Sequence, residues 1–493
     1  MSLHTVDTHA PVDPLHLMLL IGGEHRESER RIEVRNPARL DDVVGSIPDA
    51  TTAEVDDAIA AAAAAAPAWG ATSAAERIAL FAAIADAIES QADDIATLEV
   101  RENGSARYIA AREVLGAASI WREVADYLAE ILTPKDYPSG DGFVRVERRP
   151  FGVVGCIVPW NAPLILTANK IAPALAAGNA IVLKPSPFSP LGASRIAEIA
   201  ASILPPGVVN IVNGGGEAGA AIVAHREIRK LSFTGGGVTA QHIMRQAADT
   251  LTAVHFELGG NDPAIVLDDV DVRATVDRIV DSAFRRSGQV CFAVKRVYVP
   301  RALAAEFRDE LVARVDAITV GDPLEPGVTM GPMNNQGQLE RIRGLLERLE
   351  GSGRDVRVLG SRVSPETWGD GYFIQPAVVL DAQQGDEIVA TEQFGPILPI
   401  VVYDDLEQAI SWANDTEFGL CSSVWSPNRE RAIQVADRIE AGMTIINSHL
   451  FTRVGMKEIP FGGWKQSGIG WEASPYGIEE YLQFHSLDVQ SMP

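Results

Sequence analysis

Residues 153–190 have the sequence VVGCIVPWNAPLILTANKIAPALAAGNAIVLKPSPFSP, and this stretch decides the expected fold. Its apolar runs at 153–158 and 180–183 have the length of buried strands, and the segment between them predicts a helix that ends near residue 176. Ser189 and Pro190 are typical of the N-cap and the first position of a following helix. Strands and helices that alternate in this way indicate a parallel, doubly wound sheet, which binds ligands at the carboxyl ends of its strands.

The alternation continues beyond this stretch and then starts again. A second series begins near residue 263, so the sequence predicts two α/β domains. That number suits a chain of 493 residues, because a single hydrophobic core stops growing at about 250 to 300 residues. Further strands are expected at 208–212, 230–233, 294–299 and 399–402, and further helices after Gly216, after Gly237 and at 301–317.

The regions that flank the two series have patterns of their own. Residues 51–132 are rich in Ala, Glu, Arg and Leu, which favour helices. Residues 134–142 interrupt this region with Pro, Ser and Gly, and residues 143–149 alternate as a half-buried strand does. After Gly468 a helix is expected to lead into a second alternating strand at 481–489. Both strands look like excursions from the main body.

Composition excludes several classes of function. Acidic residues exceed basic ones by 66 to 42, and the resulting formal charge of -24 repels nucleic acid and anionic membrane surfaces. The N-terminus has no signal-peptide pattern, and the apolar run 15–21 is too short to span a bilayer. The 3 cysteines cannot form a disulfide framework, and no His and Cys cluster has metal-ligand spacing. We expect a soluble cytoplasmic protein that binds no nucleic acid, membrane or metal.

Three polar side chains are candidates for catalysis. Cys291 follows a glycine turn, where a thiol near backbone amides can ionise and act as a nucleophile, although a buried structural cysteine fits equally well. Glu257 ends a predicted strand and precedes two glycines. A glutamate at this position can be a buried general base or an exposed turn residue. Asn161 follows a strand, where its amide can stabilise an oxyanion or cap a turn. For Cys156 and Cys421 a structural role is preferred.

Two glycine-rich segments and one lysine indicate phosphate or ribose binding. Residues 214–219 match G-x-G-x-x-G between a strand and a helix, although they lie late in their domain. Residues 233–237 also join a strand to a helix, so their amides and the helix N-terminus can hold a pyrophosphate. Lys184 ends a strand and suits an adenosine ribose or its phosphate, or it is an ordinary snorkelling lysine.

Taken together, these segments resemble the aldehyde dehydrogenase superfamily. The strings Pro-Trp-Asn at 159–161, Lys-Pro-Ser at 184–186, Phe-Thr-Gly at 233–235, Glu-Leu-Gly-Gly at 257–260 and Gly-Gln-Val-Cys at 288–291 occur in the family's order. Residues 392–396 and 460–468 match its Glu-x-Phe-Gly-Pro and Pro-Phe-Gly-Gly-x-Lys-x-Ser-Gly motifs. The resemblance covers roughly residues 21–489. It implies a nucleotide-binding domain at 1–127 and 151–260, a catalytic domain at 261–466, and oligomerisation strands at 128–150 and 474–493 for a homodimer or homotetramer.

The resemblance also implies a role for each site residue. Cys291 is expected to be the nucleophile, Asn161 and the Cys291 amide the oxyanion hole, and Glu257 the base that activates water to hydrolyse a thioester. Lys170 and Glu472 match positions that form a proton relay in some members. The expected cofactor is NAD, with NADP possible. Its expected contacts are Val158, Pro159, Trp160, Lys184, Ser186, Pro187, Gly216, Phe233, Thr234, Gly235, Gly236, Leu258, Glu392 and Phe394.

Two departures from the family pattern concern the cofactor. Pro187 stands where many NAD-preferring members carry a glutamate, so the preference between NAD and NADP stays open. Gly236 stands where the family usually has serine, so one hydroxyl donor for the pyrophosphate is missing and backbone amides would have to suffice.

The substrate is expected to be a small aldehyde. Leu166, Val290 and Phe292 indicate an apolar tunnel for an aliphatic or aromatic aldehyde. His449 and Arg453 belong either to a solvated loop tip or to a loop whose cation meets the carboxylate of a semialdehyde. Two other functions stay possible on this scaffold. A dehydrogenase that passes the acyl group to coenzyme A is disfavoured because such relatives generally lack Glu257, and a silent structural relative is disfavoured because all three catalytic candidates are present.

Overall fold

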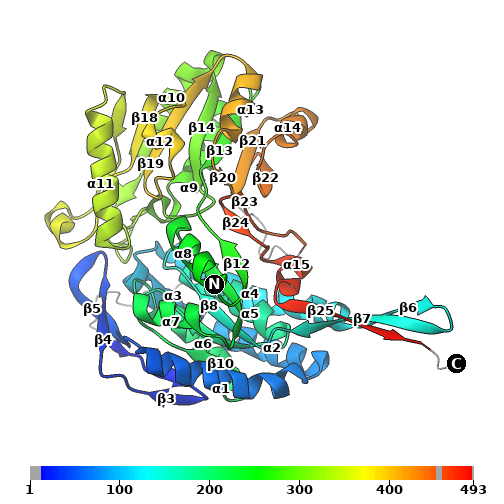
Figure 1. The fold of residues 1–493 in the computed structure, drawn as a ribbon. Helices are drawn as coiled ribbons and strands as arrows, with labels where there is room; N and C mark the ends of the chain where they lie inside the picture. Colours follow the sequence, from blue (N-terminus) through cyan, green and yellow to red (C-terminus); the bar gives the residue numbers. More distant parts are fainter. Residues whose placement is uncertain (1–12, 451–457, 491–493) are drawn as a thin grey trace.

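The computed structural model describes residues 13–450 and 458–490, and its two large sheets confirm the predicted α/β fold class (Figure 1). The larger sheet has the strand order β24-β12-β11-β8-β9-β10-β2-β3. The chain fills one side of β8 with β9 and β10 and then returns to the other side for β11 and β12, all parallel. The strand order therefore switches at β8, where sheets of this type bind their ligands. The strands are β2 (Leu19–Ile21), β3 (Glu24–Arg26), β8 (Val153–Ile157), β9 (Ala180–Lys184), β10 (Val209–Ile211), β11 (Ile228–Thr234), β12 (Ala253–Glu257) and β24 (Gly468–Ile469).

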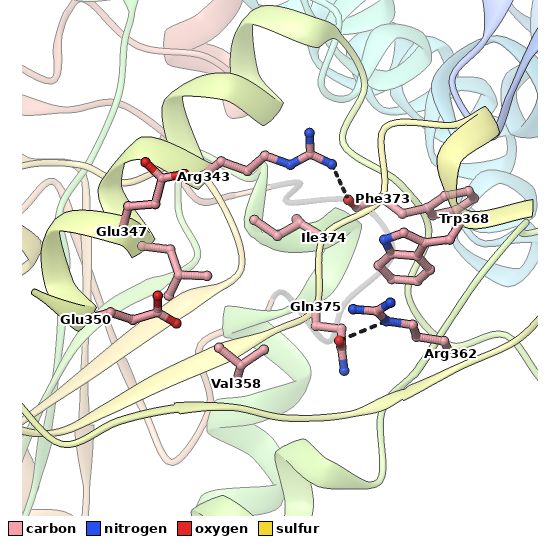
Figure 2. A pocket seen from close by; sticks show the side chains of 10 residues that line it. Arg343, Glu347, Glu350, Val358, Arg362, Trp368, Phe373, Ile374 and Gln375 are labelled. Carbon is pink, nitrogen blue, oxygen red and sulfur yellow. Dashed lines mark hydrogen bonds between the residues drawn. The ribbon is translucent and has the colours of Figure 1, made fainter. Parts of the chain in front are cut away.

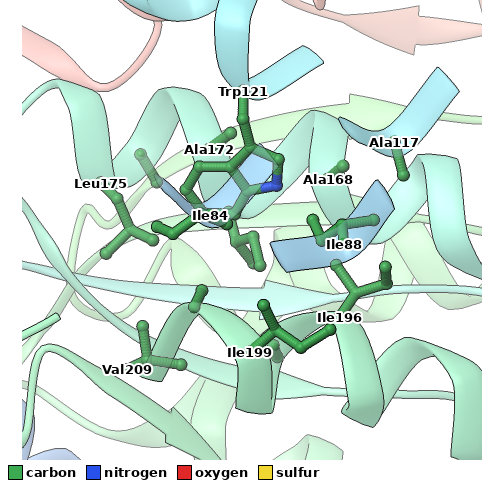
Figure 3. Packing of buried hydrophobic residues seen from close by; sticks show 14 of the residues in the cluster. Ile84, Ile88, Ala117, Trp121, Ala168, Ala172, Leu175, Ile196, Ile199 and Val209 are labelled. Atoms are coloured by element: carbon green, nitrogen blue, oxygen red, sulfur yellow. The ribbon is translucent and has the colours of Figure 1, made fainter. Parts of the chain in front are cut away.

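Helices cover both faces of this sheet, because successive side chains of a strand point to opposite faces. Val154 and Cys156 of β8 belong to a core shared with α2, α4, α5 and α6, whereas Val153 belongs to one shared with α1, α7 and α8. The indole of Trp121 lies among side chains of the first core (Figure 3). The helices are α1 (Thr52–Gly70), α2 (Ala74–Ser90), α3 (Ala92–Asn103), α4 (Arg107–Leu132), α5 (Pro163–Ala176), α6 (Leu191–Ile203), α7 (Gly216–Ala224) and α8 (Gly237–Ala247).

The second sheet has the order β16-β18-β19-β14-β13-β21-β22, with β16 antiparallel at one edge. Helices α9 and α10 pack on one face, and α11, α13 and α14 pack on the other. The strands are β13 (Asp262–Val266), β14 (Val294–Pro300), β16 (Val356–Val358), β18 (Ala377–Ala382), β19 (Ile397–Tyr403), β21 (Cys421–Trp425) and β22 (Met443–Ile446). The helices are α9 (Val272–Ala283), α10 (Ala304–Asp316), α11 (Gln336–Glu350), α12 (Glu387–Ala390), α13 (Leu406–Asn414) and α14 (Arg429–Ala436).

A small sheet, β25-β7-β6, projects from the body (Figure 1). Its strands β7 (Gly142–Pro150) and β25 (Leu482–Val489) are the two predicted excursions, and α15 (Ser474–Glu479) precedes β25. The third strand, β6 (Lys135–Ser139), occupies part of the stretch that the sequence analysis interpreted as a break. Pro138 is compatible with β6 because an edge strand tolerates a residue without an N–H group.

The structure corrects three further details. Pro190 is the N-cap of α6, and the first amides of that helix, those of Leu191 and Gly192, donate to the Glu102 carboxylate of α3 at 2.8 and 2.7 Å. The prediction that Ser189 is the N-cap of this helix is therefore wrong. The helix expected at 301–317 begins as a short 3-10 turn, Arg301–Leu303, before α10. A sheet of β1 (Leu15–His16), β5 (Arg39–Pro48) and β4 (Arg31–Asn36) was not foreseen.

In the described ranges, no helix combines the length and the apolar character that crossing a bilayer requires.

Replacing Trp121 by alanine should lower the free energy of unfolding by about 3 to 5 kcal/mol, because it deletes a large buried side chain and leaves a cavity. Trp121 is fully buried and packs edge to face on Phe81, with the ring centroids 5.0 Å apart. Tyr108→Ala is the control on the same helix, since Tyr108 is 54% exposed. Calorimetry measures the two losses, and equal losses would contradict this description of the core.

Candidate active site

The two large sheets are joined by residues 258–261, which run from the end of β12 to the start of β13. Two glycines in this crossing allow other segments to approach. A Cβ atom on Gly259 would lie 2.2 Å from Oε2 of Glu392, and one on Gly260 would lie 2.9 Å from the carbonyl oxygen of Cys291. The candidate nucleophile and a candidate cofactor ligand therefore approach the crossing at its two glycines, where a side chain would collide with them.

Cys291 lies just before β14 and is half-buried against Cys421 and Phe461. Burial raises the pKa of the Cys291 thiol, and the negative charge of Glu257 raises it further. The ammonium group of Lys295 has the opposite effect. A positive charge beside the thiol therefore partly compensates for the cost of forming a buried thiolate.

Lys295 is a site residue that the sequence analysis missed. Its side chain is 1% exposed, its Nζ donates to the carbonyl oxygen of Gly288 at 2.9 Å, and it lies 5.1 Å from the ring centroid of Phe394. Burial lowers the pKa of Lys295, and the carboxylate of Glu392 opposes this effect. A lysine inside the apolar run that follows Cys291 is the signal that would have identified it.

The amide of Asn161 reaches the segment that carries the thiol. Asn161 follows β8 at the switch point of the larger sheet, and its side chain is buried. Its Nδ2 donates to the carbonyl oxygen of Gln289, two residues before Cys291, at 3.1 Å. The structure thus brings Asn161 to the nucleophile segment.

Glu257 is 3% exposed, and neither of its carboxyl oxygens has a hydrogen-bond partner within the residues that the structure describes. Burial raises the pKa of Glu257 well above 4.5, and the carboxylate of Glu472 raises it further, whereas Lys170 lowers it. A buried carboxyl group with a raised pKa is a stronger base than an ordinary carboxylate and is suited to take a proton from water.

Lys170 and Glu472 form a buried ion pair whose Nζ and Oε1 atoms are 2.9 Å apart. Lys170 also donates to Ser232 Oγ at 3.2 Å, and this hydroxyl lies 2.8 Å from the Tyr481 hydroxyl. The two predicted relay residues are therefore in contact with each other, and both act electrostatically on Glu257.

The nicotinamide end of the expected cofactor site contains two aromatic rings and a carboxyl group. The rings of Trp160 and Phe394 are nearly perpendicular, with centroids 5.7 Å apart. Glu392 Oε1 accepts a hydrogen bond from the Gly260 amide at 3.2 Å. Burial raises the pKa of Glu392 to about 7, and Lys295 opposes the shift. These groups come from both large sheets and surround the crossing.

The expected pyrophosphate site lies where β11 meets α8. Thr234 ends β11, and its buried hydroxyl has no hydrogen-bond partner among the described residues. The Gly235 amide donates to the carbonyl oxygen of Glu257 at 3.1 Å and is not available to a phosphate. Gly236 is the N-cap of α8. The first amides of α8, rather than that of Gly235, are the backbone donors that this turn offers.

The adenosine end is formed by the ends of β8 and β9. The Val158 amide donates to the carbonyl oxygen of Lys184 at 3.1 Å, and Lys184 Nζ donates to that of Pro185 at 3.1 Å. Burial lowers the pKa of Lys184 to about 8, and the carboxylate of Asp49 opposes the shift. Asp49 Oδ1 also accepts from the Gly215 amide at 3.0 Å. The glycine-rich segment 214–219 therefore already binds a carboxylate of the protein.

Four other predicted cofactor contacts lie near this region. Ser186 and Pro187 follow Lys184 and are half-buried, and Gly216 begins α7 with open space where a Cβ atom would lie. Leu258 is buried, and its amide donates to the carbonyl oxygen of Ser467 at 2.9 Å.

The predicted substrate residues differ in where they lie. Leu166 and Val290 are buried, and Phe292 is half-buried with its ring centroid 6.0 Å from that of Phe461. His449 does not lie on a solvated loop surface. Its ring is buried, with Nδ1 2.8 Å from Ser423 Oγ and Nε2 3.4 Å from Asp262 Oδ2. Arg453 lies outside the described residues.

Part of the C-terminal motif at residues 460–468 forms a strand beside Glu257, a pairing that the sequence did not indicate. β24 pairs antiparallel with β12, so Gly468 lies opposite Glu257 and Ile469 opposite Phe256. A Cβ atom on Gly468 would lie 2.6 Å from the carbonyl oxygen of Phe256. The motif at 460–468 therefore supplies the neighbouring strand that fixes the backbone of the candidate base.

A surface hollow of about 290 Å³ lies elsewhere, against α11 and β16 (Figure 2). Two of its cations are already bonded: Arg343 donates to the Phe373 carbonyl oxygen and Arg362 to Gln375. No candidate site residue lines it. Within residues 13–450 and 458–490, no group of three or more His, Cys, Asp and Glu side chains is arranged to hold a metal ion.

Similar proteins match nearly the whole chain. The model of the aldehyde dehydrogenase family matches residues 24–487. The chain is 36% identical to the chloroplastic betaine aldehyde dehydrogenase of Beta vulgaris, over 96% of this chain and 97% of that protein. It is 37% identical to the lactaldehyde dehydrogenase of Escherichia coli (strain K12), over 93% and 95%.

Solved structures match the fold as closely. The aldehyde dehydrogenase of Mycobacterium tuberculosis complexed with NAD+ superposes with a TM-score of 0.92 at 36% identity, covering 97% of this chain and 99% of that one. A mutant aldehyde dehydrogenase C of Pseudomonas syringae complexed with NAD+ and octanal superposes with a TM-score of 0.90 at 35% identity, covering 96% of each chain. On the family match, the sequence identity and the shared fold together, this chain belongs to the aldehyde dehydrogenase family.

Proposed function

We propose that this protein oxidises an aldehyde to a carboxylic acid with NAD(P)+, through a thioester formed on Cys291. One observation carries the proposal. The segment that ends in Cys291 is hydrogen-bonded to Asn161, while Glu257, a buried carboxyl group unpaired among the described residues, is the charge that acts most on the thiol. A nucleophile, an oxyanion donor and a base are thus associated at one junction.

The residues divide the reaction as follows. The Cys291 thiolate adds to the carbonyl carbon, and the Asn161 amide and the Cys291 backbone N–H donate to the resulting oxyanion. When bound, NAD(P)+ accepts the hydride. Glu257 then takes a proton from the water that attacks the thioester carbon, the C–S bond breaks, and the thiolate of Cys291 is restored.

Glu257 must lose its proton again after each turnover. Glu472 raises the pKa of Glu257 and Lys170 lowers it, so the state of this ion pair sets how readily the base is regenerated. We assign Lys170 and Glu472 to a proton relay on this ground.

The polar groups fit a dinucleotide. The hydroxyl of Thr234, unpartnered among residues 13–450 and 458–490, and the first amides of α8 suit a pyrophosphate, and the buried ammonium of Lys184 suits the adenosine ribose. Glu392 suits the nicotinamide ribose. Asp49 supplies a carboxylate near Lys184 that repels a 2'-phosphate, which supports NAD over NADP although Pro187 replaces the usual glutamate.

The apolar residues Leu166, Val290 and Phe292 support a neutral aliphatic or aromatic aldehyde as the substrate. His449 is bound by protein groups and does not support a semialdehyde.

The exposed rings of Phe484 and Tyr137 on the β25-β7-β6 sheet support assembly into a dimer or tetramer, which light scattering would detect. The cytoplasmic location stays a prediction.

Replacing Cys291 by alanine should abolish NADH formation from a panel of aldehydes while NAD+ still binds, because only the nucleophile is removed. Cys421→Ala is the matched control, since it deletes a buried neighbouring thiol and should leave turnover within a few-fold of the parent. Persistent turnover in the Cys291 variant would overturn the proposal.

Replacing Glu257 by glutamine should lower kcat by about 100 to 10,000 fold, because the water that attacks the thioester loses its base. One equivalent of NADH per active site should still form as a burst.

The pH dependence gives a second test of Glu257. In the parent enzyme, kcat rises with pH as Glu257 loses its proton, and the raised pKa of Glu257 moves this rise above pH 4.5. The Glu257→Gln variant should lack this rise. Product analysis with and without coenzyme A separates a free acid from an acyl thioester, and a silent relative would show no burst.

Replacing Gly259 by alanine should weaken NAD+ binding about tenfold or more, because the new methyl group displaces the carboxyl group of Glu392. Gly385→Ala is the control, since a Cβ atom there meets nothing within 4 Å. Calorimetric titration measures both dissociation constants without turnover.

In the parent protein the same titration should show tighter binding of NAD+ than of NADP+, and the reverse order would contradict the role of Asp49.

A further inference from the structure

The segment before Cys291 has an unusual backbone. Arg286, Ser287 and Gly288 are consecutive and have φ values of 50, 57 and 74°. A left-handed backbone is unfavourable for residues other than glycine, and two such residues in sequence persist only where the surroundings hold them. The contacts of Arg286 show what holds this turn.

The guanidinium of Arg286 is buried among polar groups of α3, α4 and their connection. Its Nη2 donates to the Glu113 carboxylate of α4 and lies 2.9 Å from Oε1 of Glu99 in α3. Its Nη1 donates to Ser105 and, at 3.3 Å, to the side-chain oxygen of Asn103. The side chains of Arg286, Glu99 and Glu113 are 6, 0 and 4% exposed. One side chain thus attaches the nucleophile turn to two helices of the other half of the molecule.

The same helices hold the segment that carries Asn161. Glu113 Oε1 accepts from the amides of Leu164 and Ile165, at 2.9 and 3.1 Å, at the start of α5. Asn103 Nδ2 donates to the carbonyl oxygen of Trp160 at 2.6 Å. Residues on both sides of Asn161 are therefore fixed by groups that also bind Arg286.

We propose that Arg286 is a positioning residue, which holds the left-handed turn before Cys291 in register with the oxyanion donor Asn161 through Glu99, Glu113 and Asn103. The inference rests on the proposed function, since it gives the turn a task only if Cys291 is the nucleophile. The guanidinium does not touch the reacting atoms. It sets the distance between two segments that come from different sheets, and a displacement of about 1 Å between reacting groups can cost on the order of 100-fold in rate.

The test compares Arg286→Gln with a matched control, Arg101→Gln. Arg101 belongs to α3 and forms a largely buried ion pair with Asp42, 2.8 Å apart, and among the described residues it makes no hydrogen bond or ion pair with residues 286–288. For each variant, kcat, the KM values, the melting temperature and the rate of alkylation by iodoacetamide at fixed pH are measured. Arg286→Gln should lower kcat about 10 to 100 fold and change the alkylation rate of Cys291, with the KM for NAD+ nearly unchanged. Arg101→Gln should lower only the melting temperature.

Two further variants keep the inference falsifiable. Arg286→Lys retains the charge and should recover part of kcat. If Arg286→Gln does not fold, Glu113→Gln serves instead, because it keeps an oxygen for the α5 amides while weakening the contact with Arg286, and it should show the same effects more mildly. If Arg286→Gln or Glu113→Gln behaves as Arg101→Gln does, the positioning role is wrong. If Cys291→Ala retains turnover, the proposed function itself fails, whatever the Arg286 variants show.

Discussion

The carboxyl group of Glu257, which has no hydrogen-bond partner in the part of the chain that the structure describes, is the constraint on which the rest of the site depends. An ionised carboxylate without a partner is costly to bury, so the group keeps its proton to higher pH than a carboxyl group in water does. The site is arranged to preserve that state. The ammonium of Lys170, which would stabilise the charged form by direct contact, is bonded to Glu472 and Ser232 instead. A base that was permanently paired with lysine would be too weak to take a proton from water.

The second constraint is that the catalytic candidates belong to different sheets. Asn161 follows β8 and Glu257 ends β12, both in the larger sheet, whereas Cys291 precedes β14 of the other sheet. Their relative positions cannot be set by hydrogen bonds within either sheet. They depend on contacts that cross between the sheets, of which the bond from Asn161 to Gln289 and the contacts of Arg286 are the best defined. Both end on the short segment before Cys291.

The sequence predicted what is encoded locally. The strands β8 (VVGCI) and β9 (AIVLK) are nearly continuous apolar runs because both faces of the sheet are covered, and Asn161 could be placed after a strand from such a run alone. Pairings between distant segments had no local signal: β24 beside β12, the sheet of β1, β5 and β4, and β6 at an edge. Hydrogen-bond and ion-pair partners that come from distant parts of the chain were missed for the same reason. Glu102 caps α6 in place of Ser189, Asp262 binds His449 in the interior, and Lys295 is polar in a run that otherwise looked like an ordinary strand.

The pairing of β24 with β12 also has a consequence for how the molecule is made. Protein synthesis proceeds from the N-terminus, and the strand that carries Glu257 lacks its edge partner until residues 468 and 469 have been added. Glu472, which tunes the same carboxyl group, is added later still. A nascent chain thus contains the complete nucleophile segment long before it contains a finished base, so hydrolytic competence arrives only after residues 468–472 have been added.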